Sequence, residues 1–227
     1  MFDEYIPDSL KRATRNKRGS GVRRRVQCST VVPKNWRDFL RVDANKKELF
    51  TFLAEKVPPV DFGQGRAVFV TKGEVVCSPS SCDTLGLTPC NHEEADTRMI
   101  VHVAHAVQEG HRMIAIRTID TADVVVICTA AFHSLACTEL WILFGTGANY
   151  RTFANYEIAK SLGIQKSRSL PVFHALTGCD TVSHFSGKSK KKAWSTWMLD
   201  DEVTEAFFDC PRGPDDVSDE SGLPLFT

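Results

Sequence analysis

The 227-residue sequence lacks any apolar run of about 18 residues, and its longest candidates, Val124–Cys128 and Leu140–Phe144, are far shorter than a membrane span. Its first residues are polar and charged and hold no apolar secretory core. Internal repeats are absent, and no G-x-S-x-G segment supports a serine hydrolase of the α/β type. With 42% apolar and 25% charged residues, we expect an intracellular globular protein with no membrane partner.

The sequence also lacks net charge, because 28 Lys and Arg balance 28 Asp and Glu, but the charges are unevenly distributed. Residues 1–60 carry 14 basic and 7 acidic side chains, residues 61–199 carry 13 and 12, and residues 200–227 carry 1 and 9. The three segments therefore have net charges of +7, +1 and −8. This distribution predicts a basic arm at residues 8–25 that can meet phosphate groups, and an acidic, partly disordered tail at residues 200–227.

Eight cysteines in a sequence without a secretory signal indicate reduced thiols rather than a disulfide framework. The tightest group of metal-binding side chains is Cys77, Cys82, Cys90 and His92, which could hold zinc. Their spacings of four, seven and one residues do not match the common zinc-ligand spacings. Scattered loop thiols are the alternative, and the spacing favours it.

Hydrophobic periodicity predicts several helices separated by short apolar strands. Helices are expected at Asn45–Val57, with Asn45 and Glu48 as a capping box, and at Asn91–Gln108, with Asn91 and Glu94 in the same roles. Further helices are expected at 153–162, 170–176, 189–199 and 202–208, and a short basic one from Asp8 or Ser9 to about Gly19. Strands are expected at 66–71, 113–119, 123–128 and 139–144. Near-continuous apolar strands predict an α/β fold with a parallel twisted sheet flanked by helices.

Carboxylates recur where a predicted strand ends or a predicted helix begins. They are Asp3, Glu93, Glu94, Asp96, Asp120, Asp123 and Asp180. In an open parallel sheet these positions converge on one edge, and oxygen ligands favour Mg²⁺ or Mn²⁺ over zinc. Each acid taken alone also fits a structural role, as a helix cap, a partner of the helix dipole or a turn residue. The joint pattern, rather than any one acid, predicts a site.

Four blocks carry a family resemblance, and they occur in order: F-D-E-Y-I-P-D-S-L-K-R-A-T-R at 2–15, E-A-D at 94–96, T-I-D-T-A-D at 118–123 and L-T-G-C-D-T at 176–181. Together, over residues 1–197, they resemble the flap-endonuclease and XPG-type branch of the PIN-like nucleases. The chain is also similar to a group of animal proteins, often linked to mobile elements, that carry H-E-E-A-D-T-R and H-A-L-T-G-C-D-T blocks.

The resemblance implies a PIN-like, Rossmann-like three-layer domain over residues 1–199. It implies metal-dependent phosphodiester hydrolysis, of the structure-specific endonuclease or 5′-nuclease type, with DNA preferred to RNA as the partner. One or two Mg²⁺ or Mn²⁺ ions would be held by Asp3, Glu94, Asp96, Asp123 and Asp180. Asp120 is a contested sixth catalytic acid.

Two departures from the family pattern keep a second interpretation open. The family's D-x-D pair is spelled D-T-A-D at 120–123, and one added residue in a strand turns a side chain to the other face. The family's domain also begins with a strand and a metal-binding Asp ahead of the segment that matches Phe2 and Asp3, so we expect an N-terminally truncated domain that lacks its first strand. The alternative is a non-catalytic nucleic-acid-binding remnant of a nuclease or a mobile-element protein.

Two basic segments are the candidate nucleic-acid contacts. The arm supplies Lys11, Arg12, Arg15, Lys17, Arg18, Arg23, Arg24 and Arg25, and a second segment supplies Gly187, Lys188, Lys190, Lys191 and Lys192. The resemblance implies that the second segment belongs to a helix-turn-helix-like region at about 170–199 that grips the DNA backbone, with Gly187 allowing close approach. A solvated helix face and a nuclear-import signal are alternative uses of the arm. A P-loop is excluded because its first glycine would fall at Val182.

The two tryptophans that follow the second basic segment, Trp194 and Trp197, are three residues apart. Core packing is a better explanation of this spacing than stacking on nucleic-acid bases.

Overall fold

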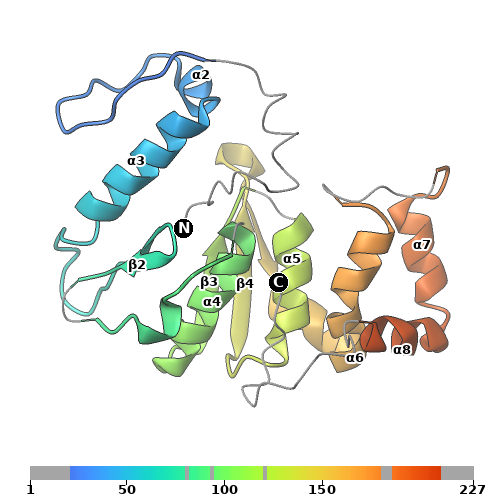
Figure 1. The fold of residues 1–227 in the computed structure, drawn as a ribbon. Coiled ribbons are helices and arrows are strands. Elements are labelled where there is room, and N and C mark those ends of the chain that lie inside the picture. Colours follow the sequence, from blue (N-terminus) through green and yellow to red (C-terminus); the bar gives the residue numbers. More distant parts are fainter. Residues whose placement is uncertain (1–20, 80–81, 93–94, 120–121, 180–185, 211–227) are drawn as a thin grey trace. The chain divides into compact units, whose positions relative to one another are not determined.

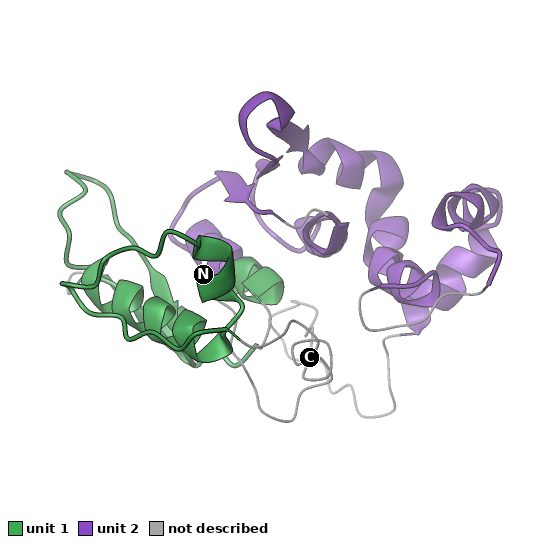
Figure 2. Cartoon of the chain, turned by 90° about the horizontal axis from the view of Figure 1, so that it is seen from above, with its two compact units in different colours: residues 1–101 green, residues 102–227 purple. Residues whose placement is uncertain are grey.

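The computed structural model describes residues 21–79, 82–92, 95–119, 122–179 and 186–210 (Figure 1). The chain forms two compact units, residues 1–101 and residues 102–227 (Figure 2). Within the described ranges, no helix combines the length and the apolar character that crossing a bilayer requires.

The described residues of the first unit form helices and a β-hairpin. In chain order its elements are α2 (Trp36–Leu40), α3 (Asp43–Lys56), β1 (Val70–Lys72), β2 (Val75–Cys77), the 3-10 turn η1 (Leu85–Leu87) and the start of α4 (Ala95–Gln108), which continues into the second unit. β1 and β2 pair antiparallel, with Thr71 opposite Val76. The turn between them uses Gly73 at a φ of +59°, a conformation that glycine adopts without steric cost.

Helix α3 confirms the helix expected at 45–57, but the expected capping box is wrong. The helix begins at Asp43 with Val42 at the N-cap, so Asn45 and Glu48 lie inside its first turns. Asn45 is fully buried, and its amide nitrogen donates to the carbonyl oxygens of Val22 (3.0 Å) and Phe39 (3.1 Å). Asn45 thus satisfies backbone groups of two neighbouring segments, as buried polar side chains generally do, and holds these segments together instead of capping its own helix.

One buried hydrophobic cluster of the first unit lies beside the β1–β2 hairpin. It consists of Val76, Leu87 and Cys90, and Phe69 and Val101 pack against it. Beside this cluster the Arg98 side chain is 1% exposed and donates to the carbonyl oxygens of His92 (2.5 Å) and Gly73 (2.6 Å). The buried guanidinium therefore ties α4 to the turn of the β1–β2 hairpin.

Helix α4 confirms the helix expected at 91–108 in its body and in its end at Gln108. Its described part begins at Ala95, and Glu94, the expected partner of Asn91 in the capping box, lies outside the described residues, so this cap stays a prediction. Gly110 follows with a φ of +94°, as expected for a glycine that closes a helix.

The second unit is built around a three-stranded sheet of order β3-β4-β5. Its elements are β3 (Met113–Arg117), α5 (Ala122–Phe132), β4 (Glu139–Phe144), η2 (Gly147–Asn149), β5 (Arg151–Ala154), α6 (Asn155–Leu176), α7 (Lys190–Trp197) and α8 (Asp201–Asp209). β3 and β4 are parallel, with Ile116 opposite Ile142, and both of these side chains are buried. β4 and β5 are antiparallel, so the α/β class is confirmed and the described sheet is mixed.

The strand expected at Asp123–Cys128 is wrong, because this segment forms helix α5. The run V-V-V-I-C is β-branched and apolar, and such composition favours a strand when it is considered locally. However, parallel neighbours cannot be joined by a tight turn and need a crossover, which is usually a helix. A buried helix and a buried strand both require apolar side chains. Composition alone therefore does not distinguish α5 from a strand.

Helix α6 differs from the two helices expected at 153–162 and 170–176. Residues 151–154 form strand β5, and the helix then runs from Asn155 to Leu176. Gly163, at a φ of +75°, interrupts its helical geometry where the first expected helix ended. The helices expected at 189–199 and 202–208 are confirmed as α7 and α8, with the Ser189 side chain capping α7.

An aromatic cluster joins α6, α7 and α8. Phe173 stacks on Trp197 with ring centroids 4.9 Å apart, and Trp194 and Phe207 meet Trp197 edge-on. Trp197 is 2% exposed, and its indole nitrogen donates to the Thr204 hydroxyl at 3.0 Å. The expected core role of the two tryptophans is confirmed. Because Thr204 belongs to α8, the acidic segment that follows residue 200 packs onto α6 over residues 201–209.

Replacing Trp197 by Phe should destabilise the second unit. The change removes the donor to Thr204 and leaves a small cavity beside Phe173, which together should lower the free energy of unfolding by about 1–3 kcal/mol. Chemical denaturation monitored by circular dichroism measures the loss. Trp194→Phe is the matched control, because Trp194 is only half-buried, and it should cost less. Equal losses for the two variants would show that the hydrogen bond and the burial of Trp197 contribute nothing special.

Candidate functional site: an Asp–His–Lys chain in the second unit

A hydrogen bond joins Asp123 and His174 between two helices of the second unit. Asp123 lies in the first turn of α5, and His174 lies in the last turn of α6. The distance from His174 Nε2 to Asp123 Oδ1 is 2.7 Å. The His174 side chain is 16% exposed and the Asp123 side chain is 31% exposed, so the two lie at the surface with limited access to water.

Lys190, the first residue of α7, extends this pair into a chain of three side chains. Its ammonium nitrogen lies 2.9 Å from His174 Nδ1 and 2.8 Å from the carbonyl oxygen of Gly178, and the His174 carbonyl oxygen is 3.5 Å away. A cation at the end of α6 also meets the negative end of the helix dipole. The carboxylate of Asp123, in the first turn of α5, is correspondingly placed at a positive helix end.

Packing of α5, α6 and α7 sets this geometry. α5 and α6 lie against each other, and the Phe173–Trp197 stack holds α7 against the end of α6, next to His174. After α6 the chain leaves the helix at Thr177, whose hydroxyl donates to the Phe173 carbonyl at 2.6 Å, and turns at Gly178 with a φ of +96°. This turn directs the Gly178 carbonyl toward Lys190.

Three blocks noted in the sequence therefore come together. Asp123 belongs to T-I-D-T-A-D, His174 and Gly178 belong to H-A-L-T-G-C-D-T, and Lys190 belongs to the lysine segment. Because Asp123 lies in a helix rather than a strand, the expectation that D-T-A-D reverses a strand face does not apply.

The other expected acids are not brought into this arrangement by the described residues. Asp3, Glu94, Asp120 and Asp180 lie outside the described ranges, as does Glu93. Asp96 lies half-buried in the first turn of α4, in the first unit, whereas Asp123 belongs to the second. Within the described part of the chain, no three His, Cys, Asp or Glu side chains come together closely enough to hold a metal ion.

The zinc interpretation can be judged more fully, because all four of its residues are described. Cys90 is 1% exposed in the core with Val76 and Leu87. None of the eight cysteines, which all lie within the described ranges, is joined in a disulfide. Burial, and then the nearby Arg98, lower the pKa of His92 below its ordinary value. These residues form no zinc site in the described structure, and core packing accounts for Cys90.

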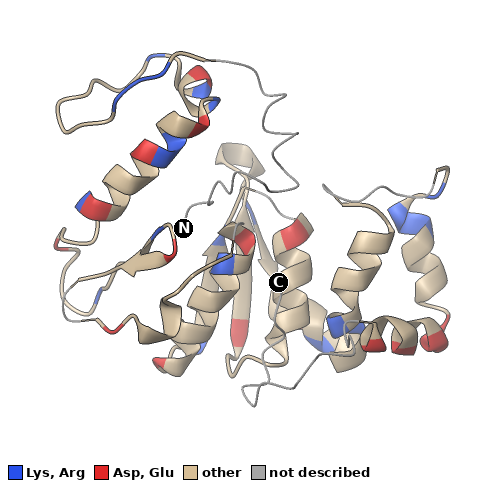
Figure 3. Ribbon diagram, viewed as in Figure 1, with Lys and Arg blue, Asp and Glu red and all other residues tan. Residues whose placement is uncertain are grey.

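The lysine segment presents its charges unevenly. Lys188, Lys191 and Lys192 are exposed, whereas Lys190 is half-buried by its contacts with α6. Figure 3 shows basic residues at the start of α7 and acidic residues along α8. Gly187 has a φ of +72°, and a Cβ built there would meet no described atom within 4 Å, so a turn conformation accounts for this glycine.

The basic arm is described from Gly21 onward, so Lys11, Arg12, Arg15, Lys17 and Arg18 lie outside the described ranges. Its described part is held along α3. The backbone N–H of Arg24 donates to Asn45 Oδ1 at 2.9 Å, and that of Val26 donates to Glu48 Oε1 at 3.0 Å. The Arg23 guanidinium pairs with the Glu48 carboxylate, while Arg24 and Arg25 are exposed. Of the three described arginines, two are thus available to phosphate.

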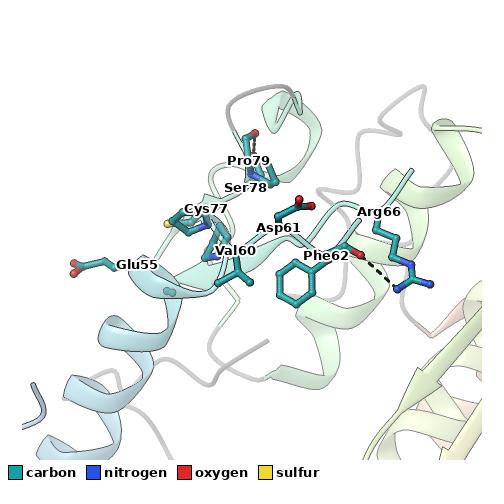
Figure 4. A pocket seen from close by; sticks show the side chains of 11 residues that line it. Glu55, Val60, Asp61, Phe62, Arg66, Cys77, Ser78 and Pro79 are labelled. Atoms are coloured by element: carbon teal, nitrogen blue, oxygen red, sulfur yellow. Dashed lines mark hydrogen bonds between the residues drawn. The ribbon is translucent and has the colours of Figure 1, made fainter. Parts of the chain in front are cut away.

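A pocket of about 600 Å³ also lies in the first unit. Figure 4 shows Asp61, Phe62 and Arg66 on one part of its lining and Cys77 and Ser78 on another. Arg66 donates weakly to the Phe62 carbonyl at 3.4 Å, and Asp61 Oδ1 accepts from the Gly63 backbone at 2.7 Å. The polar groups therefore mostly serve the local loop, and the lining does not define one ligand chemistry.

His174 is the member of the chain that the sequence analysis did not identify as a site residue, and Lys190 was given a different set of contacts. The available signal was indirect, because His174 opens the H-A-L-T-G-C-D-T block that ends near Asp180. Nothing in the spacing of Asp123, His174 and Lys190 along the chain indicates that they meet. Their contact depends on the packing of three helices, which periodicity does not specify.

Comparisons of the chain with models of protein families, with curated proteins and with solved structures found no match. The class that the fold and site define is a mixed α/β protein. Its distinguishing feature is the Asp123–His174–Lys190 chain beside three exposed lysines.

The link between the arm and α3 should depend on pH. The hydrogen bond from Arg23, followed by that from the Val26 backbone, lowers the pKa of Glu48 below its ordinary value of 4.5. The stabilisation is therefore complete above pH 4.5 and is lost as the pH falls through the lower, folded-state pKa. An NMR titration of the Val26 amide should follow this protonation in the wild type and show no such step in Glu48→Gln. Glu74→Gln, an exposed acid of the same unit, should leave the titration unchanged; an unaltered titration in Glu48→Gln would contradict the assignment.

Proposed function

We propose that this protein hydrolyses phosphodiester bonds in nucleic acid with one or two Mg²⁺ or Mn²⁺ ions. The proposed class is a structure-specific endonuclease or 5′ nuclease with a PIN-like three-layer fold, acting on DNA in preference to RNA. The observation that carries the proposal is the hydrogen-bonded chain that runs from Asp123 through His174 to Lys190. It joins two of the acidic blocks of the family resemblance to the lysine segment.

The position of Asp123 in the fold supports this proposal. α5 connects the parallel strands β3 and β4, so its first turn follows the carboxyl end of β3. In open α/β sheets, ligands bind preferentially outside the carboxyl ends of the strands. Oδ1 of Asp123 accepts the hydrogen bond from His174, which leaves Oδ2 as the oxygen that would hold a cation.

The chemistry of the proposed ligands suits magnesium or manganese. Asp3, Glu94, Asp96, Asp123 and Asp180 would supply oxygen atoms only, and these ions prefer such ligands. Bound there, the ions would lower the pKa of an attacking water and neutralise charge on the scissile phosphate. Two of the five acids, Asp96 and Asp123, are among the described residues, so the proposed ligand set rests on the sequence pattern.

The exposed cations account for substrate binding in this proposal. Lys188, Lys191 and Lys192 lie at the start of α7, in the same unit as Asp123, and Arg24 and Arg25 lie on the arm of the first unit. Lysine and arginine contacts to phosphate carry no sequence information. The proposed substrate is therefore recognised by its backbone and shape rather than by its bases.

A second candidate function is non-catalytic binding of nucleic acid. It is favoured by one observation, that no three metal-binding side chains come together within the described part of the chain. The exposed lysines and arginines would bind phosphate without any ion. The two candidate functions differ in whether the bound strand is cleaved in a reaction that depends on metal ions and on Asp123.

A cleavage assay separates these candidates. The full chain would be incubated with fluorescent single-stranded and flap DNA and with Mg²⁺ or Mn²⁺. Asp123→Asn should lower the cleavage rate by more than the roughly 10–100-fold that loss of an outer-shell partner of a metal costs, while DNA affinity is retained. Glu109→Gln, an exposed acid in the same unit, should leave cleavage unchanged, and thermal melting should show that both variants are folded.

Each outcome of the assay has a defined meaning. Salt-dependent DNA binding by the wild type without cleavage in either ion would support the non-catalytic candidate. Cleavage that survives in Asp123→Asn would contradict the proposed role of Asp123. A wild-type protein that neither binds nor cleaves DNA or RNA would exclude both functions.

A further inference from the structure

We infer that Lys190 is a positioning residue that acts through His174 on Asp123, whereas the neighbouring Lys188, Lys191 and Lys192 bind the phosphates of the strand. The inference divides one lysine run into two functions. Its catalytic consequence rests on the proposed function, because it requires that Asp123 takes part in phosphodiester hydrolysis.

The protein itself supplies hydrogen-bond acceptors for the Lys190 ammonium group. An ammonium carries three N–H donors, and three acceptors of the protein lie within reach: His174 Nδ1 at 2.9 Å, the Gly178 carbonyl at 2.8 Å and the His174 carbonyl at 3.5 Å. A phosphate could be bound only by giving up one or more of these contacts. The three exposed lysines have no such cost to overcome.

The two partners of the His174 ring determine which of its nitrogens carries the hydrogen. An ammonium group donates and never accepts, so His174 Nδ1 must accept from Lys190. With its lone pair used at Nδ1, the neutral ring carries its hydrogen on Nε2, and this hydrogen is donated to Asp123 Oδ1 at 2.7 Å. Both neighbours favour this tautomer, because the carboxylate only accepts and the ammonium only donates. Lys190 therefore adds the second anchor, at Nδ1, that fixes the orientation of the ring against Asp123.

The position of Lys190 on α7 explains why this lysine, rather than Lys191 or Lys192, contacts His174. Residues at i, i+4 and i+7 share one face of a helix, and counting from Lys190 these positions are Trp194 and Trp197. Both tryptophans contact Phe173 of α6, so this face of α7 is the packed one. Lys191 and Lys192 fall on other faces and are exposed, and Lys188 precedes the helix.

The arrangement couples substrate binding to the acid. The beginning of α5, the end of α6 and the beginning of α7 meet at the Asp123–His174–Lys190 chain. A strand bound by the exposed lysines would hold α7 at the same end at which Lys190 orients His174. The ligand class implied for this surface is a polyanionic phosphate backbone, and the regulated group is the Asp123 carboxylate.

The test compares Lys190→Met with the matched variant Lys191→Met in the full, metal-free chain. Nitrogen-15 NMR of histidine-labelled protein reports the hydrogen bond that His174 Nδ1 accepts. The wild type and Lys191→Met should show the Nδ1 resonance of a nitrogen that accepts a hydrogen bond, and Lys190→Met should show it shifted to the position of an acceptor without a donor. A role of Lys190 in helix packing alone would not shift this one ring nitrogen.

Binding of single-stranded DNA as a function of salt provides the second measurement. Lys191→Met should reduce the slope of log affinity against log salt by about 0.7, the value for one lost phosphate contact on a single strand. Lys190→Met should leave this slope unchanged. In cleavage assays Lys190→Met should lower kcat about 10–100-fold, as for loss of an outer-shell partner, with little change in KM.

Two further variants keep the test decisive if Lys190→Met does not fold. Lys190→Gln can still donate to Nδ1 without carrying charge, and should preserve both the hydrogen bond to Nδ1 and the salt slope. His174→Gln can donate to Asp123 and accept from Lys190, so it should retain more activity than His174→Phe.

The inference is overturned if Lys190→Met reduces the salt slope as Lys191→Met does, or if the Nδ1 resonance of His174 is the same in both variants. Absence of cleavage by the wild type would defeat the proposed function instead. In that case the NMR and salt measurements would still decide whether Lys190 positions His174.

Discussion

Parallel pairing of β3 with β4 is the constraint on which the second unit depends. Two parallel neighbours need a long connection that returns to the starting edge of the sheet, and α5 provides it. The crossover places Asp123 in a first turn after β3 and gives α5 an apolar surface against which α6 packs. Once α6 lies there, the end that carries His174 meets the beginning of α5. The Asp123–His174 hydrogen bond is thus a consequence of strand direction as much as of its two side chains.

Much of the fold follows from the sequence, and the exceptions have physical causes. Helix α4 and strands β3 and β4 have strong periodicity or β-branched composition, and the structure contains them. The run after Asp123 is different, because a buried crossover helix and a buried strand need the same side chains. Asn45 fits a helix cap locally, yet three segments of chain meet around it, and its buried amide satisfies their backbone groups. Tertiary demands of this kind override a local preference.

The candidate site could be predicted only in part for a similar reason. The blocks that contain Asp123 and His174 are visible in the sequence, but the hydrogen bond between residues 51 positions apart depends on helix packing. Charge counts mislead in the same way. Arg23 and Lys190 contribute to the basic segments as counted, yet each is engaged by the protein itself, through Glu48 or through His174 and Gly178. The charge available to a partner is smaller than the formal charge, and it lies on particular faces.

Because Gly163 interrupts the helical geometry of α6, we expect the two halves of this helix to unfold locally as separate segments. A continuous helix of 22 residues would transmit the orientation of its first turns, next to β5, to its last turn. With the helical geometry interrupted at residue 163, the second half takes its orientation from its own contacts: α5, the Phe173–Trp197 stack, and the link from Ser169 to the Thr204 carbonyl in α8. In native-state hydrogen exchange, this half of α6 would therefore open together with α7 and α8 as one cooperative segment, separately from the β-sheet. His174 would leave Asp123 with that segment, so local unfolding of these helices and loss of the Asp123–His174 hydrogen bond would be the same event.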